Sequence, residues 1–311
     1  MSNNWQLGIA SHKGTKKERN EDSSLHLLQP DQNGNDISLF AVADGMGGYE
    51  RGDAASNIAI TELNKWWDRR IQKIIKKKDA LDRAVKETEK LFHDINKAVQ
   101  VLGRHTGSKT GTTLSVLLMY KGEYASLHVG DSRIYHMKDW HYGFQQYFHH
   151  ESQSADSVSG LLDEQPTEIL ENEPELLQLT KDHSWVGKQI EAGLMDEEEA
   201  RNHPKRNVLT QCLGIGDTID IDSRRGTYQS TDLFLLCSDG FYSLYSKEEI
   251  QNMLISLEKE YGNLQSICDY LVHFSNYSQA YDNVTLLLVR NFYVHQEQKS
   301  KKTIFSFLPG N

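Results

Sequence analysis

Three apolar runs of this chain each meet an aspartate at one end. Asp44 ends the run in FAVADGMGG, Asp239 ends the run in LFLLCSDG, and Asp282 directly precedes NVTLLLVR. Such runs are typical of buried strands, and a carboxylate at the end of a buried strand is costly unless a positive charge meets it. Three such strand ends in one chain predict a shared cation site. We therefore expect a metal-dependent hydrolase.

Length and charge limit the number of domains and the kinds of partner that the chain can have. The 311 residues contain no stretch rich in proline, glycine and serine that would divide them, so we expect one domain. With 38% hydrophobic residues, the chain can bury a sizeable core. Its net charge of -10 argues against a surface for nucleic acid or for an anionic membrane.

The cysteines and the first residues indicate the compartment. Cys212, Cys237 and Cys268 are odd in number and lack CxxC spacing, so neither a disulfide framework nor a zinc site is expected. The chain does not open with a basic region followed by an apolar stretch, and no apolar run approaches the roughly 18 residues of a membrane span. These features predict a cytoplasmic protein without membrane insertion.

The order of strand-like and helix-like segments predicts the fold class. Strands come in groups and helices come in pairs, without the alternation that builds a parallel sheet, so we expect an α+β protein with antiparallel sheets. Asn33-Gly34 is a strong hairpin signal, and Ser246 with Glu249 forms a capping box at a helix start. The expected strands are 6–11, 24–29, 37–44, 112–120, 124–130, 133–139, 219–229, 232–239 and 283–290; the expected helices start near residues 53 and 246 or span about 79–102 and 263–280.

Five further motifs follow one another along the chain. Together with the aspartate motifs, and in this order, they resemble the metal-dependent protein phosphatases of type 2C, most closely the bacterial branch. The resemblance runs from about Gly8 to about Arg290, which is nearly the whole chain. The five motifs are Asn20-Glu21-Asp22, Gly111-Thr112-Thr113, Val129-Gly130-Asp131-Ser132-Arg133, Leu179-Thr180-Lys181-Asp182-His183-Ser184, and HPKRNVLTQCLG from His203 to Gly214.

The resemblance implies a four-layer αββα sandwich, in which two central antiparallel sheets are flanked by helix pairs and a binuclear metal site lies at one end. The phosphatase domain would comprise residues 1–291, with a flap-like segment at about 184–207. The connection at about 141–178 is longer than the family's usual one. Its part 151–175 is rich in Ser, Glu and Asp and poor in large apolar residues, so we expect a mobile acidic loop there. The tail, 292–311, is either a frayed end or a docking peptide.

The resemblance also implies metal ligands. Asp44 would bridge two ions, the carbonyl of Gly45 would bind one of them, and Asp239 with Asp282 would bind the other. Oxygen ligands of this kind suit Mn²⁺ or Mg²⁺ rather than Zn²⁺. Further residues expected to hold metals or metal-bound waters are Glu21, Asp22 and, with Asp239 at a third and weaker site, Asp131.

The chain departs from the family pattern at two places. Met46 stands where some eukaryotic members carry a histidine, a candidate general acid, so that leaving-group protonation would fall to a metal-bound water or another group. Lys17 stands where the family has its phosphate-binding arginine, five residues before Asp22. A lysine offers a point charge where arginine offers a bidentate fork, so phosphate binding would be weaker or arranged differently. Arg19 lies nearby on a different spacing.

The main hypothesis is a phosphatase that acts on phosphoserine and phosphothreonine in proteins and opposes a bacterial-type serine/threonine kinase. One alternative is a signalling module that binds phosphoproteins without turnover, which Lys17 leaves open. The other is an esterase for a small phosphorylated metabolite, because a fold does not fix a substrate.

Overall fold

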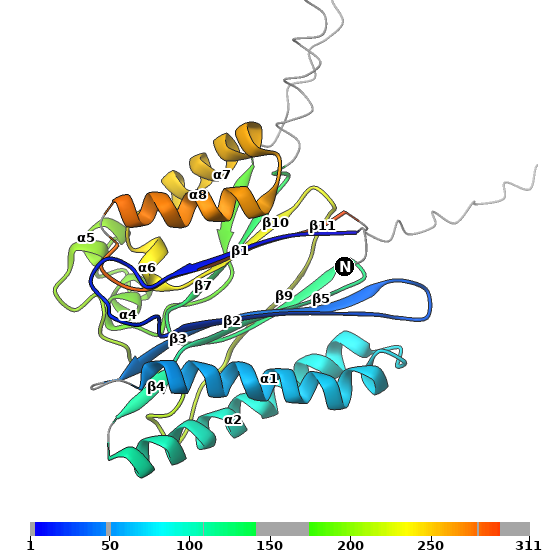
Figure 1. The fold of residues 1–311 in the computed structure, drawn as a ribbon, viewed down its shortest axis with the longest axis horizontal. Coiled ribbons are helices and arrows are strands. Elements are labelled where there is room, and N and C mark those ends of the chain that lie inside the picture. The colour runs from blue at the N-terminus through cyan, green and yellow to red at the C-terminus, as the bar shows by residue number, and fades with distance from the viewer. Residues whose placement is uncertain (1–3, 48–50, 108, 141–173, 279, 293–311) are drawn as a thin grey trace, which may run out of the picture.

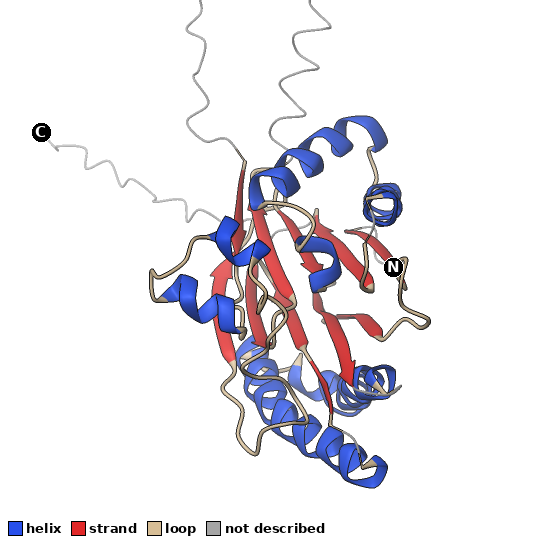
Figure 2. Ribbon diagram, turned by 90° about the vertical axis from the view of Figure 1, so that its left-hand side faces the viewer, coloured by secondary structure: helices blue, strands red, loops and turns tan. Residues whose placement is uncertain are grey.

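The computed structural model describes residues 4–47, 51–107, 109–140, 174–278 and 280–292. Two antiparallel sheets pack face to face, and a pair of long helices covers the outer face of each sheet (Figure 1). Seen from the side, the strands lie between helices above and helices below (Figure 2). The predicted four-layer αββα arrangement is therefore confirmed.

The two sheets are built from strands that are distant in the sequence. One sheet has the order β1-β11-β10-β7-β8 and the other has the order β2-β3-β5-β6-β9, with β4 paired to β3. Because β1 pairs with β11, the first and last described strands close one sheet together. The strands are β1 Trp5–His12, β2 Asp22–Pro30, β3 Asp36–Gly47, β4 Thr110–Thr112, β5 Leu114–Tyr120, β6 Glu123–Val129, β7 Arg133–Lys138, β8 Glu175–Gln178, β9 Asp222–Thr227, β10 Leu233–Cys237 and β11 Val284–Asn291.

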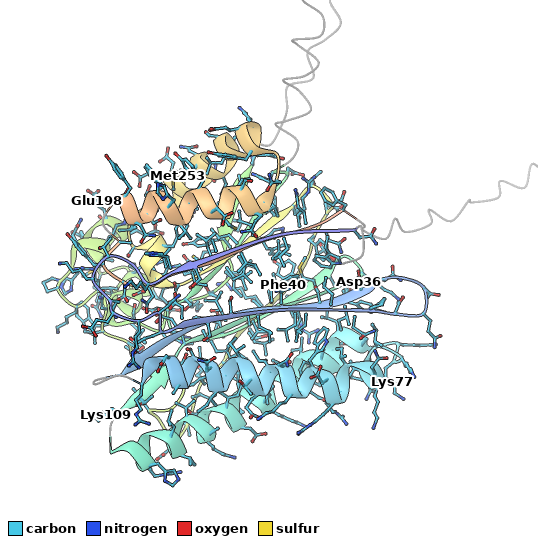
Figure 3. All side chains as sticks on the ribbon, in the orientation of Figure 1. Asp36, Phe40, Lys77, Lys109, Glu198 and Met253 are labelled. Carbon is cyan, nitrogen blue, oxygen red and sulfur yellow. The ribbon has the colours of Figure 1, made fainter. Side chains whose placement is uncertain are left out.

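The long helices cover the sheets, and the short ones gather at one end. The pair α1 and α2 covers the sheet of β2 and β3, whereas α7 and α8 cover the other sheet; α4, α5 and α6 lie at the left-hand end in Figure 1. Glu198 marks this end and Lys77 the opposite one (Figure 3). The helices are α1 Gly52–Ile74, α2 Ala80–Thr106, α4 Trp185–Glu191, α5 Glu197–Asn202, α6 Asp239–Tyr242, α7 Lys247–Tyr261 and α8 Leu264–Tyr277.

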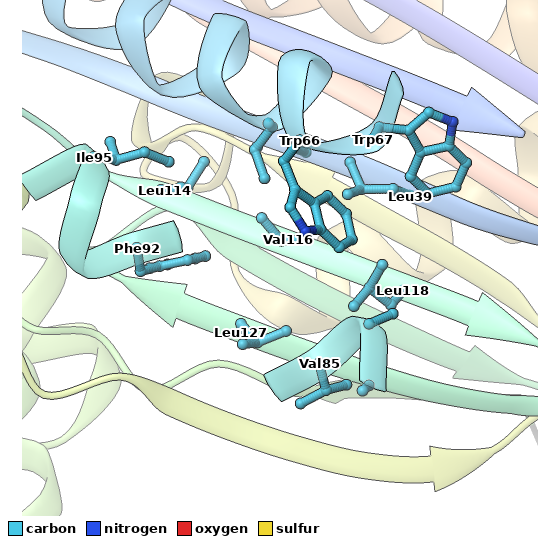
Figure 4. Packing of buried hydrophobic residues seen from close by; sticks show 14 of the residues in the cluster. Leu39, Trp66, Trp67, Val85, Phe92, Ile95, Leu114, Val116, Leu118 and Leu127 are labelled. Carbon is cyan, nitrogen blue, oxygen red and sulfur yellow. The ribbon is translucent and has the colours of Figure 1, made fainter. Parts of the chain in front are cut away.

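Three apolar layers hold the sandwich together. Between the sheets, Phe40 packs with Phe234 and Leu287, all of them almost fully buried. Under α1 and α2, the Trp66 and Trp67 rings meet edge to face and cover side chains of the strands (Figure 4). A third cluster lies under α7 and α8. Burial of apolar area on both faces of both sheets supplies the main driving force for this fold.

The local signals in the sequence are confirmed. The β2–β3 hairpin turns at Asn33-Gly34, where Gly34 has φ of +82°. Ser246 and Glu249 form the predicted capping box at the start of α7. The three cysteines are buried and form no disulfide.

The predicted acidic loop needs one correction at its C-terminal end. Residues 175–178 form β8, which pairs with β7 and buries Leu176 completely. This short segment carries two apolar residues, Leu176 and Leu177. Burial of the Leu176 side chain favours its pairing with the edge of the sheet. Residues 141–173 lie outside the described part of the chain, as does the tail from residue 293 onward.

None of the helices that the structure describes combines the length and the apolar character needed to cross a membrane.

Gly8 provides a test of the packing between β1 and α8. A Cβ atom on Gly8 would lie 2.1 Å from the Leu264 carbonyl oxygen and 2.8 Å from Cys268 Sγ. We expect Gly8→Ala to lower the free energy of unfolding by about 3 kcal/mol, because α8 must move off the sheet. The control is Gly107→Ala, since Gly107 has φ of +67° but no atom within 4 Å. It should cost only about 1 kcal/mol of backbone strain. Equal losses in urea denaturation would contradict the packing argument.

Candidate active site

The predicted aspartates meet at the end of the sandwich that carries the short helices. Asp22 opens β2 directly opposite Asp44 of β3. Asp239 is the first residue of α6, which follows β10 after one residue. The turn at Gly240 lies against the Asp282–Asn283 segment, because a Cβ atom on Gly240 would be 2.0 Å from the Asn283 carbonyl oxygen. Four strand ends thus converge at one point of the fold.

The carboxylates are withdrawn from solvent to different degrees: Asp22 is buried, Asp44 and Asp239 are half-buried, and the side chain of Asp282 is 39% exposed. Burial, reinforced by the charges of Asp22, Asp239 and Asp131, raises the pKa of Asp44 well above its ordinary value. Burial also raises the pKa of Asp22 to about 7 and that of Asp239 to about 6, with neighbouring carboxylates adding to both shifts. Without a compensating positive charge, such a group of carboxylates can be ionised only at high cost.

Asp131 belongs to the same cluster. Its carboxyl group is buried, and burial together with the charges of Asp239 and Asp182 raises its pKa well above the ordinary value. The hydroxyls of Thr113 and Ser132 hydrogen-bond at 2.6 Å beside it, which fixes the loop that carries Asp131 to the start of β5.

This oxygen-rich cluster fits a divalent cation. Asp22 Oδ1 is buried and has no hydrogen-bond partner among the described residues, so one acceptor remains for a cation. The atoms available as metal ligands are carboxylate and carbonyl oxygens, which suit Mg²⁺ or Mn²⁺. Within the described ranges, no three His, Cys, Asp or Glu side chains are already drawn together closely enough to hold an ion.

The backbone at Gly45 has no room for a side chain. A Cβ atom there would lie 2.1 Å from the Gly52 carbonyl oxygen and 2.7 Å from that of Glu21. Glu21 Oε1 accepts a hydrogen bond from the Gly52 N–H at 3.0 Å, so one carboxylate oxygen of Glu21 anchors the start of α1. The first glycine of the DGMGG motif is therefore required by the close packing of three backbone segments.

Residues that the sequence interpretation left without a role hold the aspartates in place. The Asp44 N–H donates to Thr113 Oγ1 at 2.9 Å, and Thr112 Oγ1 donates to the Asp44 carbonyl at 3.0 Å. Ser238 Oγ donates to Asp22 Oδ2 at 2.7 Å. The GTT motif and the serine before Asp239 are thus explained as braces for the carboxylates.

Asn283 anchors the turn that carries Lys17. Its Nδ2 donates to the carbonyls of Lys13 and Arg19, both at 2.9 Å, and its Oδ1 accepts from the Glu21 N–H at 2.9 Å. The residue after Asp282 therefore has a structural task that the sequence did not reveal. Its only signal was its position next to that aspartate.

The structure brings Lys17 into the site and turns Arg19 away from it. Lys17 Nζ lies 2.8 Å from Asp282 Oδ1 and 3.9 Å from Glu21 Oε2. Burial lowers the pKa of Lys17, but the hydrogen bond to Asp282 and the surrounding carboxylates more than reverse this and leave it raised. The side chain of Arg19 is 60% exposed, and its guanidinium lies 3.9 Å from Asp53.

A second ion pair ties the neighbouring loop to the site. Arg133 binds Asp182 through two nitrogens at 2.7 and 3.0 Å and stacks over the Tyr242 ring at 3.7 Å. The backbone N–H of His183 donates to the Gly130 carbonyl at 2.7 Å, and the Gly130 N–H donates to His183 Nδ1 at 3.2 Å. The LTKDHS motif is therefore explained by its attachment to the loop of Asp131.

Two buried histidines have structural roles. His128 lies between Ser115 Oγ at 2.8 Å and the Gly130 carbonyl at 2.9 Å, and His136 contacts Asp232 at 2.8 Å. Both histidines are fully buried.

Comparisons with known proteins agree with this geometry. The family described as protein phosphatase 2C matches residues 11–283. The serine/threonine phosphatase stp of Listeria welshimeri is 30% identical over 83% of this chain and 86% of its own length. The protein phosphatase PhpP of Streptococcus pneumoniae is 29% identical over 91% and 96%, respectively.

Solved structures show the same fold. A serine/threonine phosphatase of S. agalactiae superposes with a TM-score of 0.70 at 23% identity, covering 92% of this chain and 99% of its own. The catalytic domain of the phosphatase PstP, solved with two manganese ions, superposes with a TM-score of 0.65 at 23% identity, covering 92% and 98%.

The buried His128 leads to a pH prediction. Burial, with His183 nearby, lowers the pKa of His128 to about 3. An unfolded histidine takes up a proton near pH 6.5, so the stability that neutral His128 contributes is present above that pH and is lost as the pH falls toward 3. Between pH 6.5 and 4.5 this amounts to about 2 to 3 kcal/mol.

Acidification has the opposite effect through the aspartates, because protonation of carboxylates with a raised pKa stabilises the folded state. The informative measurement is therefore the difference in stability between the wild type and a His128 variant. Urea unfolding at several pH values, in chelator, should show a weaker loss of stability on acidification for His128→Gln than for the wild type. His93→Gln, at an exposed position of α2, is the matched control and should follow the wild type. Parallel curves for wild type and His128→Gln would contradict a neutral buried His128.

Proposed function

Because the chain belongs to the protein phosphatase 2C family, we propose that it hydrolyses phosphoserine and phosphothreonine in proteins with the help of two divalent ions. The observation that carries the proposal is the convergence of Asp22, Asp44, Asp239 and Asp282 at one end of the sandwich, with Lys17 beside them. The names of the relatives, serine/threonine phosphatase stp and protein phosphatase PhpP, support the choice of substrate.

Each acidic residue has a proposed place around the ions. Asp44 would be a ligand of both ions, the Gly45 carbonyl would hold one of them, and Asp239 with Asp282 would hold the other. When bound, Mn²⁺ or Mg²⁺ ions lower the pKa of water and neutralise phosphoryl oxygens. The structure that contains PstP with two manganese ions supports manganese as one choice. The remaining proposed contributors are Glu21, Asp22 and, at a third site with Asp239, Asp131.

The chain's own groups would orient the substrate. Lys17 lies at the edge of the aspartate cluster, where its ammonium can turn from Asp282 to a phosphoryl oxygen. Met46 offers no proton, so the side chain next to Gly45 does not act as a general acid. The rigid strand ends keep the carboxylates in place during the reaction.

We also propose the organisation around this site. Residues 1–291 form the phosphatase domain, with an acidic loop between β7 and β8, a flap-like segment at about 184–207, and a tail at 292–311. A phosphorylated protein is the substrate and a serine/threonine kinase is the opposing enzyme. Three buried thiols without a disulfide fit a reducing compartment such as the cytoplasm.

The metal requirement tests the function directly. Hydrolysis of a phosphothreonine peptide should need added Mn²⁺ or Mg²⁺ and stop in excess chelator. Asp44→Asn should reduce kcat more than Asp131→Asn, because it removes a charge common to both ions. An aryl phosphate serves as the comparison substrate.

Three results would contradict the proposal. Full turnover in chelator after dialysis would exclude the metal role. Binding of the phosphopeptide without turnover would identify a signalling module, and turnover of small phosphate esters alone would identify a metabolite esterase.

Lys17 provides a separate test of phosphate binding. Lys17→Ala should raise KM for the phosphopeptide roughly tenfold, the worth of one charge-assisted contact of about 1.5 kcal/mol. Lys17→Arg should preserve or improve activity, because a guanidinium can make two parallel bonds. Arg19→Ala is the matched control, since Arg19 faces Asp53. A large rise in KM for Arg19→Ala alone would transfer the role to Arg19.

A further inference from the structure

A hollow opens beside the aspartate cluster. It lies between the helices α4 and α5 on one side and α6 with the start of α7 on the other, and it is partly open to solvent. Asp131 and Asp239 line its inner end. The hollow, here called the α5–α7 cleft, is therefore continuous with the proposed metal site.

The walls and the rim of the cleft differ in character. Val186, Ala200 and Tyr245 contribute apolar surface to its walls, whereas Arg201 of α5 and Lys247 of α7 bring positive charge to it from opposite sides. Such a combination of apolar walls with a few placed charges is typical of ligand sites.

Two of the cations that line the cleft, Arg201 and Lys247, are not held by the fold that the structure describes. In the described part of the chain, neither Arg201 nor Lys247 has a hydrogen bond or ion pair through its side chain. Arg133, which also lines the cleft, is by contrast held by Asp182.

Two acidic residues lie close to these cations. Glu197 lines the cleft. The carboxylate of Glu249 accepts the Ser246 N–H in the capping box, and these hydrogen bonds, with a smaller contribution from Arg201, lower its pKa. Glu249 is therefore committed to the helix start, and the two cations are available for a ligand.

We propose that the α5–α7 cleft is a substrate subsite for an anionic group, either a carboxylate or a second phosphoryl group, that lies near the scissile phosphoryl group in the phosphoprotein. Arg201 and Lys247 bind this group from the two sides of the cleft. The inference rests on the proposed function, since it requires the phosphoryl group to react at the aspartate cluster. An extended peptide advances about 3.3 Å per residue, so the bound anion belongs to a residue within a few positions of the phosphothreonine.

The test compares phosphothreonine peptides that differ at one position. Each position from three before to three after the phosphothreonine carries Gln, Glu, Lys or a phosphonate analogue of phosphoserine that cannot be hydrolysed. For the wild type with Mn²⁺, we expect kcat/KM to be roughly tenfold higher for an anion than for Gln at one of these positions. The Glu and phosphonate arms distinguish a carboxylate from a second phosphoryl group.

Variants test whether Arg201 and Lys247 cause the preference for peptides with an anionic residue. Arg201→Gln combined with Lys247→Gln should remove the preference for the anion. Lys86→Gln with Lys97→Gln, which removes the same charge from exposed positions of α2, should retain it. Arg201→Glu with Lys247→Glu should reverse it and favour the Lys peptide, a gain that a misfolded protein cannot show.

The possible failures are distinguishable. If the wild type hydrolyses none of the phosphopeptides, both the proposed function and the subsite are wrong. If it hydrolyses them without a preference for an anion, or if the Gln variants keep that preference, only the subsite is wrong.

Discussion

The structure depends on how the chain manages several carboxylates buried at one end of the sandwich. Asp131 is buried, Asp44 and Asp239 are half-buried, and the charge of Asp239 raises the pKa of both Asp44 and Asp131. Apolar packing could stabilise this fold without them, so their burial is a cost that only function explains. The cost is met by hydrogen bonds from Ser238 and by positive charge, some of it from Lys17.

The fold makes this concentration of charge possible by fixing the backbone from both sheets. Asp22 and Asp44 belong to one sheet, whereas Asp239 and Asp282 follow or precede strands of the other. Hydrogen bonds that involve Thr112, Thr113 and Asn283 then hold the connecting turns, each across a long separation in sequence. A site that bridges two sheets is rigid only if the sheets cannot slide, and the interleaved aromatic layer around Phe40 and Phe234 prevents this.

Much of this could be predicted from the sequence, and the reasons for the failures are physical. Apolar runs, the Asn33-Gly34 turn and the Ser246 capping box are local signals, so the long strands and the two pairs of long helices were predicted with the correct type, whereas the short helices α4, α5 and α6 were not predicted. The aspartates could be placed because they end such runs. The metal-binding roles themselves stay predictions until ions are measured.

Contacts between distant segments escaped the sequence. The three bonds of Asn283 reach residues more than 260 positions away, and the pair Arg133–Asp182 spans 49 positions. The strand β8 was hidden because four residues at the end of an acidic segment carry little periodic signal. The α5–α7 cleft likewise exists only once α5 and α7, far apart in the chain, lie side by side.

The net charge of the chain determines how its few cationic contacts can act. At -10, the protein as a whole repels a phosphorylated, anionic partner. Physiological salt screens this repulsion beyond about 8 Å, so it slows approach without forbidding contact. Lys17, Arg201 and Lys247 lie within or beside the acidic site, where screening is weakest and a charge-assisted bond is strongest. We therefore expect selection among phosphoproteins to be made after contact, by groups close to the reacting phosphoryl group, rather than by attraction from a distance.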